Sequence, residues 1–192
     1  LRYSDSSLRY WKEEQTGEGY LYSVSSDIHR IFRTSSLCDG FFYNQDLSVG
    51  ECMTGSDGTT LRFESDNEKV VTPAGVFEGC QLWITKHYDI YTGTSVYKVY
   101  YKDGIGIVKY TAVNCCVTDT RLLGKYNIVG GAGLLPMQKD NTWEYVSEYD
   151  PKYMYSELSC RVVHADDRSV IIASTDIIER FGYDENSWQD MI

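Results

Sequence analysis

The residues with the widest chemical repertoire in this chain are three histidines and six cysteines, and their spacing supports no metal centre. The histidines, His29, His87 and His164, lie in separate segments, and no two have the spacing of a zinc motif such as His-x-x-x-His. The cysteines form no Cys-x-x-Cys pair. We therefore predict no metal site and expect each histidine to be a partly exposed strand residue.

The cysteines permit disulfide bonds in an oxidising compartment, but the sequence leaves their pairing open. Their number is even, whereas their wide spacing differs from that of a dense disulfide scaffold. A bond between the neighbours Cys115 and Cys116 would be strained, so each is expected to pair elsewhere or to stay reduced. Free, buried cysteines that pack as small hydrophobic residues are the alternative. The six are Cys38, Cys52, Cys80, Cys115, Cys116 and Cys160.

No recognisable catalytic centre is present. A cysteine nucleophile could use Cys80 or Cys160, but both lie within apolar strand segments, where the pKa of a thiol rises and its reactivity falls. The sequence lacks a Gly-x-Ser-x-Gly turn and a Walker phosphate loop. Residues 130–133 are rich in glycine without the Gly-x-Gly-x-x-Gly spacing of a dinucleotide site. We predict a protein that is not an enzyme and has no cofactor.

Short acidic clusters are the remaining candidates for chemistry, and turn formation accounts for them. None follows the Asp-x-Asp-x-Asp-Gly pattern of a calcium loop, and Asp and Asn are common in turns without any metal. A glycan hydrolase needs two carboxylates facing one cleft, a geometry that no sequence reveals, so it is the least favoured alternative. The clusters are Asp57-Gly58, Asp66-Asn67-Glu68, Asp166-Asp167 and Asp184-Glu185-Asn186.

The aromatic content suggests a second kind of site. Seventeen Tyr and four Trp are many for 192 residues, and Tyr-rich sheet faces can stack on sugars or peptides. If exposed and coplanar, Trp83, Tyr97 and Tyr101 are the candidate ligand-contact residues. The alternative is that these side chains simply pack within strands, which tyrosine favours.

The charge excludes some partners. Acidic residues outnumber basic ones by 28 to 18, and the net charge of -10 argues against nucleic acid and against electrostatic docking on anionic lipid. No apolar stretch approaches the roughly 20 residues that span a bilayer. Because the chain begins at Leu1 without a signal-peptide pattern, we expect any targeting segment to lie outside it.

The elements that would position these residues are strands. Alternating segments rich in Tyr, Val, Ile and Thr predict a mainly β fold, a curved antiparallel sheet of meanders and hairpins with at most short helices. Segments 80–88, 95–101 and 106–113 are joined by turn-like residues and predict a three-stranded meander. Segments 60–64 and 68–72 predict a hairpin around Asp66-Asn67. Further strands are expected at 19–24, 27–32 and 141–146.

The glycine-rich stretch divides the chain. We predict a β domain at 1–120, a connection at 121–133 and a second β unit at 134–192. In the second unit, 158–164 and 169–175 flank a turn and predict a hairpin, whereas 176–181 is ambiguous between strand and short helix.

Residues 40–113 resemble an uncharacterised group of bacterial exported proteins and lipoproteins. The resemblance rests on Thr72-Pro73-Ala74-Gly75-Val76-Phe77 and on Tyr100-Tyr101-Lys102-Asp103-Gly104-Ile105-Gly106-Ile107-Val108-Lys109. Leu135-Pro136, followed by Asn141-Thr142-Trp143-Glu144-Tyr145, is similar to the opening of a unit in that group, with Asp140 in place of a glycine. Either the chain comes from a repeated protein, or the two parts complete one sheet. The resemblance implies no catalytic residues.

These observations together favour an extracytoplasmic, non-enzymatic β-domain that acts as a binding or structural module of the bacterial cell envelope. Its expected partner is a hydrophobic ligand, a peptide or a glycan. A carbohydrate-binding module that uses exposed Tyr and Trp is the main alternative.

Overall fold

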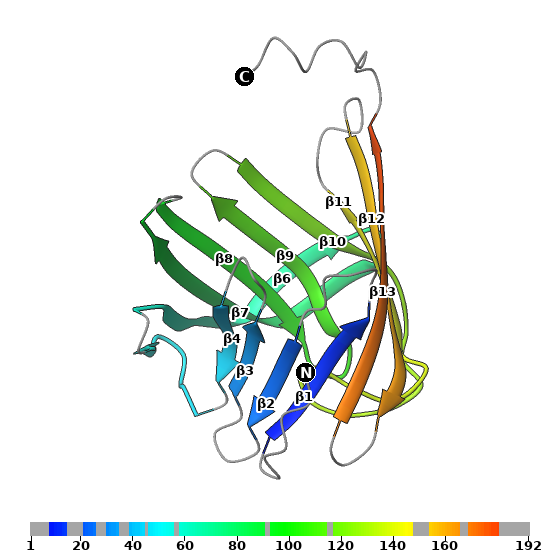
Figure 1. The fold of residues 1–192 in the computed structure, drawn as a ribbon, viewed down its shortest axis with the longest axis horizontal. Coiled ribbons are helices and arrows are strands. Elements are labelled where there is room, and N and C mark those ends of the chain that lie inside the picture. The colour runs from blue at the N-terminus through cyan, green and yellow to red at the C-terminus, as the bar shows by residue number, and fades with distance from the viewer. Residues whose placement is uncertain are drawn as a thin grey trace.

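The fold was analysed in a computed structural model, which describes residues 8–14, 21–25, 30–34, 39–44, 46–55, 58–90, 93–114, 117–147, 154–165 and 169–180. Strands and no helix are found in this part of the chain (Figure 1). The strands are β1 Leu8–Glu14, β2 Leu21–Ser25, β3 Arg30–Thr34, β4 Asp39–Asn44, β5 Cys52–Thr54, β6 Thr60–Thr72, β7 Gly75–Asp89, β8 Gly93–Lys102, β9 Gly106–Asn114, β10 Val117–Asn127, β11 Thr142–Ser147, β12 Met154–Ala165 and β13 Ser169–Arg180. Accordingly, no described helix is long and apolar enough to cross a membrane.

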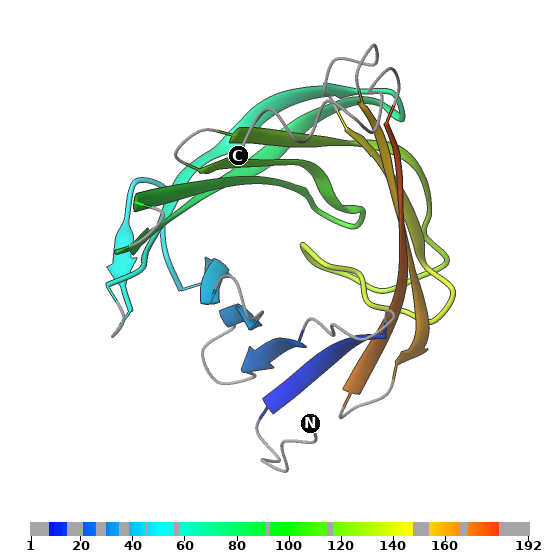
Figure 2. The same cartoon turned by 45° about the horizontal axis from the view of Figure 1, so that its top comes forward.

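The described strands form one sheet. From β5 to β13 each strand pairs antiparallel with the next one in the chain, and β13 then pairs with β1 in parallel. Strands β2, β3 and β4 continue the sheet, so β4 and β5 lie at its two ends. The sheet is strongly curved, and β4 lies on its inner side, where it contacts β6 and β7 (Figure 2). The predicted mainly β, curved antiparallel sheet is confirmed.

The central strands follow the predicted alternation. In β8, Ser95, Tyr97, Val99 and Tyr101 are buried, whereas the residues between them are more exposed. Because successive side chains in a strand point to opposite faces, one face of β8 is the core face. Pairing of β7 with β8 and of β8 with β9 confirms the meander. The β12–β13 pairing likewise confirms the predicted hairpin, and β13 continues as a strand to Arg180.

The predicted hairpin around Asp66-Asn67 is wrong. Strand β6 runs without a break through these residues, and the chain turns instead at Pro73-Ala74 before pairing β6 with β7. Three register shifts occur along this pair, and Asn67 donates a backbone hydrogen bond to the Ser65 hydroxyl over 3.3 Å. The polar residues thus form bulges rather than a turn.

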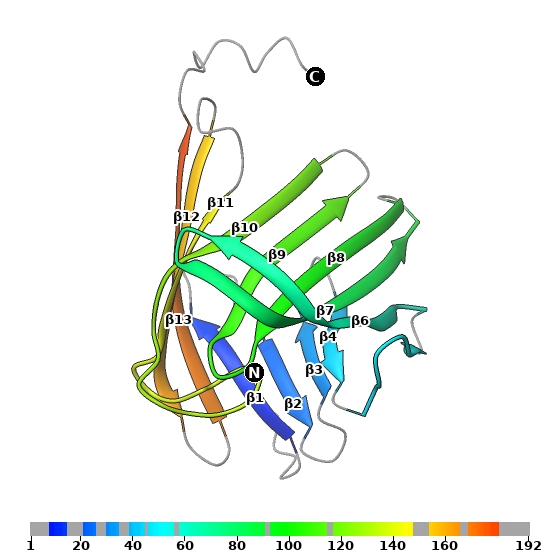
Figure 3. The same cartoon turned by 180° about the vertical axis from the view of Figure 1, so that it is seen from behind.

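The β6–β7 hairpin folds back over the outside of the sheet. Its end crosses β9 and β10 in the view from behind (Figure 3). The Ala74 amide donates a hydrogen bond to the Leu123 carbonyl over 3.0 Å, which ties the turn to β10. Phe77 is buried just after this turn.

The connection predicted at 121–133 is shorter than expected, because β10 extends to Asn127. Strand β11 then pairs with β10, so residues on both sides of the connection belong to one sheet. Predicted strands 19–24 and 27–32 correspond to β2 and β3, with 19–20 and 27–29 outside the described residues. Residues 181–192 also lie outside them.

The loop that follows β10 is organised by Asn141, whose side chain is fully buried. Its Oδ1 accepts a hydrogen bond from the Val129 amide over 2.8 Å. Its Nδ2 donates to the Gly130 carbonyl over 2.8 Å and also to the Pro136 carbonyl. The Val162 amide donates to the Asn141 carbonyl over 2.9 Å. The Asn141 side chain therefore fixes the loop, and the backbone of the same residue joins it to β12.

The turn between β8 and β9 is closed by side chains from β11. Trp143 Nε1 donates a hydrogen bond to the Ile105 carbonyl over 2.6 Å, and the Tyr145 hydroxyl donates to the Ile107 carbonyl over 3.0 Å. The register of β8 against β9 shifts between Tyr100 and Tyr101, just before this turn. The two sequence patterns that carry the resemblance therefore meet at this turn.

Substitution of Gly106 by Ala is expected to destabilise the protein by about 2–3 kcal/mol. Gly106 has a φ of 111°, and an added Cβ would lie 3.1 Å from Trp143 Nε1. Gly104 is the matched control, since its φ is 72° but a Cβ would meet nothing within 4 Å. Urea denaturation should give a smaller loss, about 1 kcal/mol, for Gly104→Ala. Equal losses would show that contact with Trp143 contributes nothing.

Candidate functional site

A small pocket opens beside the inner face of the sheet where β6, β7 and the β8–β9 turn meet the loop after β10. Its volume is about 240 Å³. Residues within β6 and β7 and residues of loops contribute to it, so its shape depends on the position of the loop after β10. The lining residues are Leu47, Phe63, Gln81, Trp83, Asp103, Gly133 and Leu134.

Two stacked aromatic rings form its most rigid wall. The rings of Phe63 and Trp83 have centroids 4.2 Å apart and are inclined by only 5°. The two residues are a cross-strand pair of β6 and β7, which places them side by side on one face. Trp83 Nε1 donates a hydrogen bond to Gln81 Oε1 over 3.0 Å, which fixes the tilt of the indole. Tyr43 of β4 contacts Trp83 with centroids 6.2 Å apart.

The opposite wall is held by the backbone. The Gly104 amide donates a hydrogen bond to the Gly133 carbonyl over 3.0 Å, which fixes Leu134 next to the β8–β9 turn that bears Asp103. Leu134 is buried and belongs to the hydrophobic core. The pocket thus combines apolar walls with one exposed carboxylate, Asp103.

Comparison with known proteins assigns neither a family nor a function to the chain. The chain matches no protein-family model, no curated protein and no solved structure. Its chemistry has to be inferred from its own residues.

The three aromatic residues expected to contact a ligand are not exposed. Trp83, Tyr97 and Tyr101 have exposed fractions of 1%, 5% and 1%. They lie on the inner face of β7 and β8, and β4 packs over this face, because Tyr43 meets Tyr101 with ring centroids 5.4 Å apart. Only Trp83 lines the pocket. The expected coplanar, exposed arrangement is therefore not found, because the same alternation that aligns these rings also buries them.

Sequence reasoning missed the other pocket residues. Gln81 and Trp83 are two residues apart in β7, a spacing that puts them on one face and could have suggested a common role. Asp103 lay within a predicted turn, where acidic residues are ordinary. No sequence signal connects Leu47 or Leu134 with these strands.

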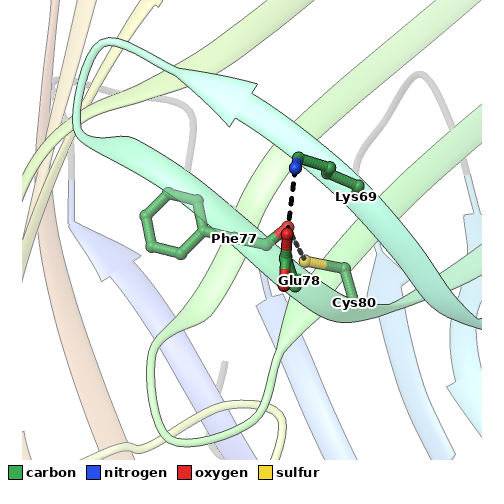
Figure 4. Close-up of polar contacts among 4 residues, drawn as sticks. All are labelled: Lys69, Phe77, Glu78 and Cys80. Atoms are coloured by element: carbon green, nitrogen blue, oxygen red, sulfur yellow. Dashed lines mark hydrogen bonds and ion pairs between the residues drawn. The ribbon is translucent and has the colours of Figure 1, made fainter.

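Cys80 lies outside the pocket, near the bend of the β6–β7 hairpin (Figure 4). Its thiol is buried and donates a hydrogen bond to the Phe77 carbonyl over 3.6 Å. Burial raises the pKa of this thiol, Lys102 opposes the increase, and Glu68 adds to it. Next to it, Lys69 Nζ pairs with Glu78 over 2.9 Å at the surface. This environment is that of an unreactive packing cysteine.

The remaining candidate residues do not converge. Cys52 is an exposed free thiol, and Cys160 is half-buried. His87 Nδ1 lies 2.9 Å from the Thr59 hydroxyl, whereas His164 is exposed on β12. Among the described residues no group of three or more His, Cys, Asp or Glu side chains could hold a metal. His29, Cys38, Cys115 and Cys116, together with 57, 166–167 and 184–186, lie outside the described residues.

Asp140, which stands where the resembling group has glycine, adopts a φ of 74°. Its carboxylate accepts a hydrogen bond from Arg161 over 2.7 Å. This bond holds the pKa of Asp140 below its ordinary value of 3.8, and the charge of Lys139 acts in the same direction. Arg161 thus supports Asp140 in a backbone conformation that few residues adopt.

The Asp140–Arg161 pair predicts a specific dependence of stability on pH. Because the folded-state pKa of Asp140 is lowered, its contribution is present above the ordinary value of 3.8 and is lost as the pH falls through the folded-state pKa. We expect Asp140→Asn to melt at a lower temperature than the parent near neutral pH and to approach it in acid. Melting curves over about pH 2 to 6 test this. Asp66→Asn, a substitution of an exposed residue, is the control, and its melting temperature should change with pH as that of the parent does.

Proposed function

We propose that the chain is a non-enzymatic, extracytoplasmic β-domain of the bacterial cell envelope that captures a peptide by enclosing one of its side chains in the Phe63–Trp83 pocket. The size of the pocket supports this choice. A volume of about 240 Å³ lies below the roughly 300–1,000 Å³ of sites that enclose drug-sized ligands. A single side chain fits such a space, whereas an acyl chain or a run of sugars needs more. The envelope location is supported by the sequence resemblance.

The charge around the pocket favours a basic side chain. Asp103 is exposed at the pocket, and no Lys or Arg among the described residues forms an ion pair with it. The flat, weakly hydrated guanidinium of arginine suits a pocket with apolar walls and one carboxylate better than a compact ammonium group does. An arginine side chain would lay its methylene groups along Leu134 and direct its charge to Asp103.

The other functions considered have less support. The aromatic residues expected for a carbohydrate-binding surface are buried. Among the described lining residues Asp103 is the single carboxylate, so they do not offer the pair that glycoside hydrolysis uses.

Calorimetry with three short peptides tests the proposal. The peptides are alanine pentamers that carry arginine, leucine or glutamate at the centre. We expect the arginine peptide to bind most tightly and Asp103→Asn to weaken it about tenfold, since a charge-assisted hydrogen bond is lost. Asp66→Asn removes an equal charge from an exposed residue that does not line the pocket, and it should leave binding unchanged. Equal binding of the arginine and glutamate peptides, or no loss in Asp103→Asn, would contradict the proposal.

A further inference from the structure

The outer face of β6, β7 and β8 differs in charge from the rest of the protein. Arg62, Ile84 and Lys98 form one cross-strand row, and Thr60, Lys86 and Val96 form the next. The neighbouring row of Phe63, Trp83 and Val99 faces the core, so these two rows point outward.

Three cations therefore surround one aliphatic side chain. Arg62 and Lys98 flank Ile84 directly, and Lys86 lies diagonally next to Lys98, at a separation of roughly 7–8 Å between backbones. All three cations are exposed. Within this group of cations, Arg62 pairs with the carboxylate of Glu64 over 2.8 Å. In a chain of net charge -10, this surface is locally basic.

Among the described residues, the two most exposed large hydrophobic side chains lie where β7 turns into β8. Tyr88 is 68% exposed and follows Lys86 on the outer face of β7. Ile90, in the turn that follows, is 77% exposed. The cations and these two side chains together form the basic tip, defined as Arg62, Lys86, Tyr88, Ile90 and Lys98.

We propose that the basic tip docks on a bilayer surface that carries anionic headgroups. Lysines contribute about 1 kcal/mol each near such a surface, and tyrosine favours the boundary between headgroup and acyl chain. Lysine is depleted in protein–protein interfaces, so a tip with two exposed lysines fits headgroups better than a protein partner. The net negative charge of the chain, which is unfavourable for docking on anionic headgroups, is a sum over its whole surface. The attraction between the basic tip and the headgroups acts only within about 10 Å of the contact. This docking is independent of the pocket.

Sedimentation of the full chain with vesicles tests the proposal. Vesicles of phosphatidylcholine with about 30 mol% phosphatidylglycerol are compared with pure phosphatidylcholine. We expect binding to the anionic vesicles at about 50 mM salt and release at about 500 mM. The double variant Lys86→Ala/Lys98→Ala should bind about thirtyfold more weakly. Ile90→Ser should weaken binding without changing its dependence on salt.

The matched control is Lys125→Ala/Lys139→Ala, which removes the same charge from two exposed residues outside the basic tip. It should bind like the parent. Absence of binding to anionic vesicles, or equal losses in the two double variants, would overturn the proposal. Capture of the chain by polyglutamate, reduced in Lys86→Ala/Lys98→Ala but without vesicle binding, would also overturn it and would indicate an acidic protein as the partner.

Discussion

Asn141→Asp is expected to lower the free energy of unfolding by about 4 kcal/mol, which is a large part of the stability of an ordinary domain. The Asn141 amide donates to two carbonyls, those of Gly130 and Pro136, in a fully buried position. A carboxylate cannot donate, and it would face both carbonyl oxygens with a buried charge. Urea denaturation measures the loss.

Asn127→Asp is the control for this substitution. Asn127 ends β10 and is exposed, so the same chemical change there should alter stability by less than about 0.5 kcal/mol. If Asn141→Asp were equally mild, the loop after β10 would not depend on the Asn141 side chain. Because Leu134 lies in this loop, the Asn141 variant should also lose binding of the arginine peptide.

Trp83→Ala is expected to cost about 4 kcal/mol of stability. The indole is 1% exposed, stacks on Phe63 at 4.2 Å and contacts Tyr43, so its removal leaves a cavity next to the pocket. Tyr88→Ala is the control, since Tyr88 is 68% exposed and its removal should cost less than about 0.5 kcal/mol.

Added indole offers a second measurement on the Trp83 variant. An apolar cavity of this kind binds small aromatic molecules, and a ligand that binds only the folded state raises the melting temperature. We expect indole to stabilise Trp83→Ala and to leave the parent protein unchanged. No stabilisation would mean that the surrounding side chains close the cavity when the indole is removed.

The sequence predicted the elements whose residues alternate clearly. In β8, the regular alternation made the strand predictable, and the structure shows a buried residue at every second position. The β6–β7 pairing was misjudged, because Asp66 and Asn67 are typical of turns and bulges alike and only the pairing partner distinguishes them. Strand β10 was assigned in part to the connection, since Gly124 within it weakens the strand signal.

The pocket was beyond prediction for a different reason. Phe63 and Trp83 come together through the register of β6 against β7, and three bulges set that register. Leu134 and Asp103 come together through one backbone hydrogen bond between two loops. Neither the register of this strand pair nor the hydrogen bond between the loops can be recognised from residue types. The prediction that Trp83, Tyr97 and Tyr101 form an exposed surface is wrong, because alternation identifies a face but does not say whether another strand covers it.

The single parallel pairing, between β1 and β13, affects how the protein unfolds. Every other pairing in the described sheet joins strands that follow each other in the chain, so strand pairing joins β1–β4 to β5–β13 at this seam alone, although β4 also packs on β6 and β7. Loss of the seam disrupts no other strand pair, which makes it the natural first step of partial opening. Amide hydrogens of β8 and β9 should then exchange with solvent only on global unfolding, and those of β1 and β2 earlier. Two-state analysis would describe the β5–β13 run better than the sheet as a whole.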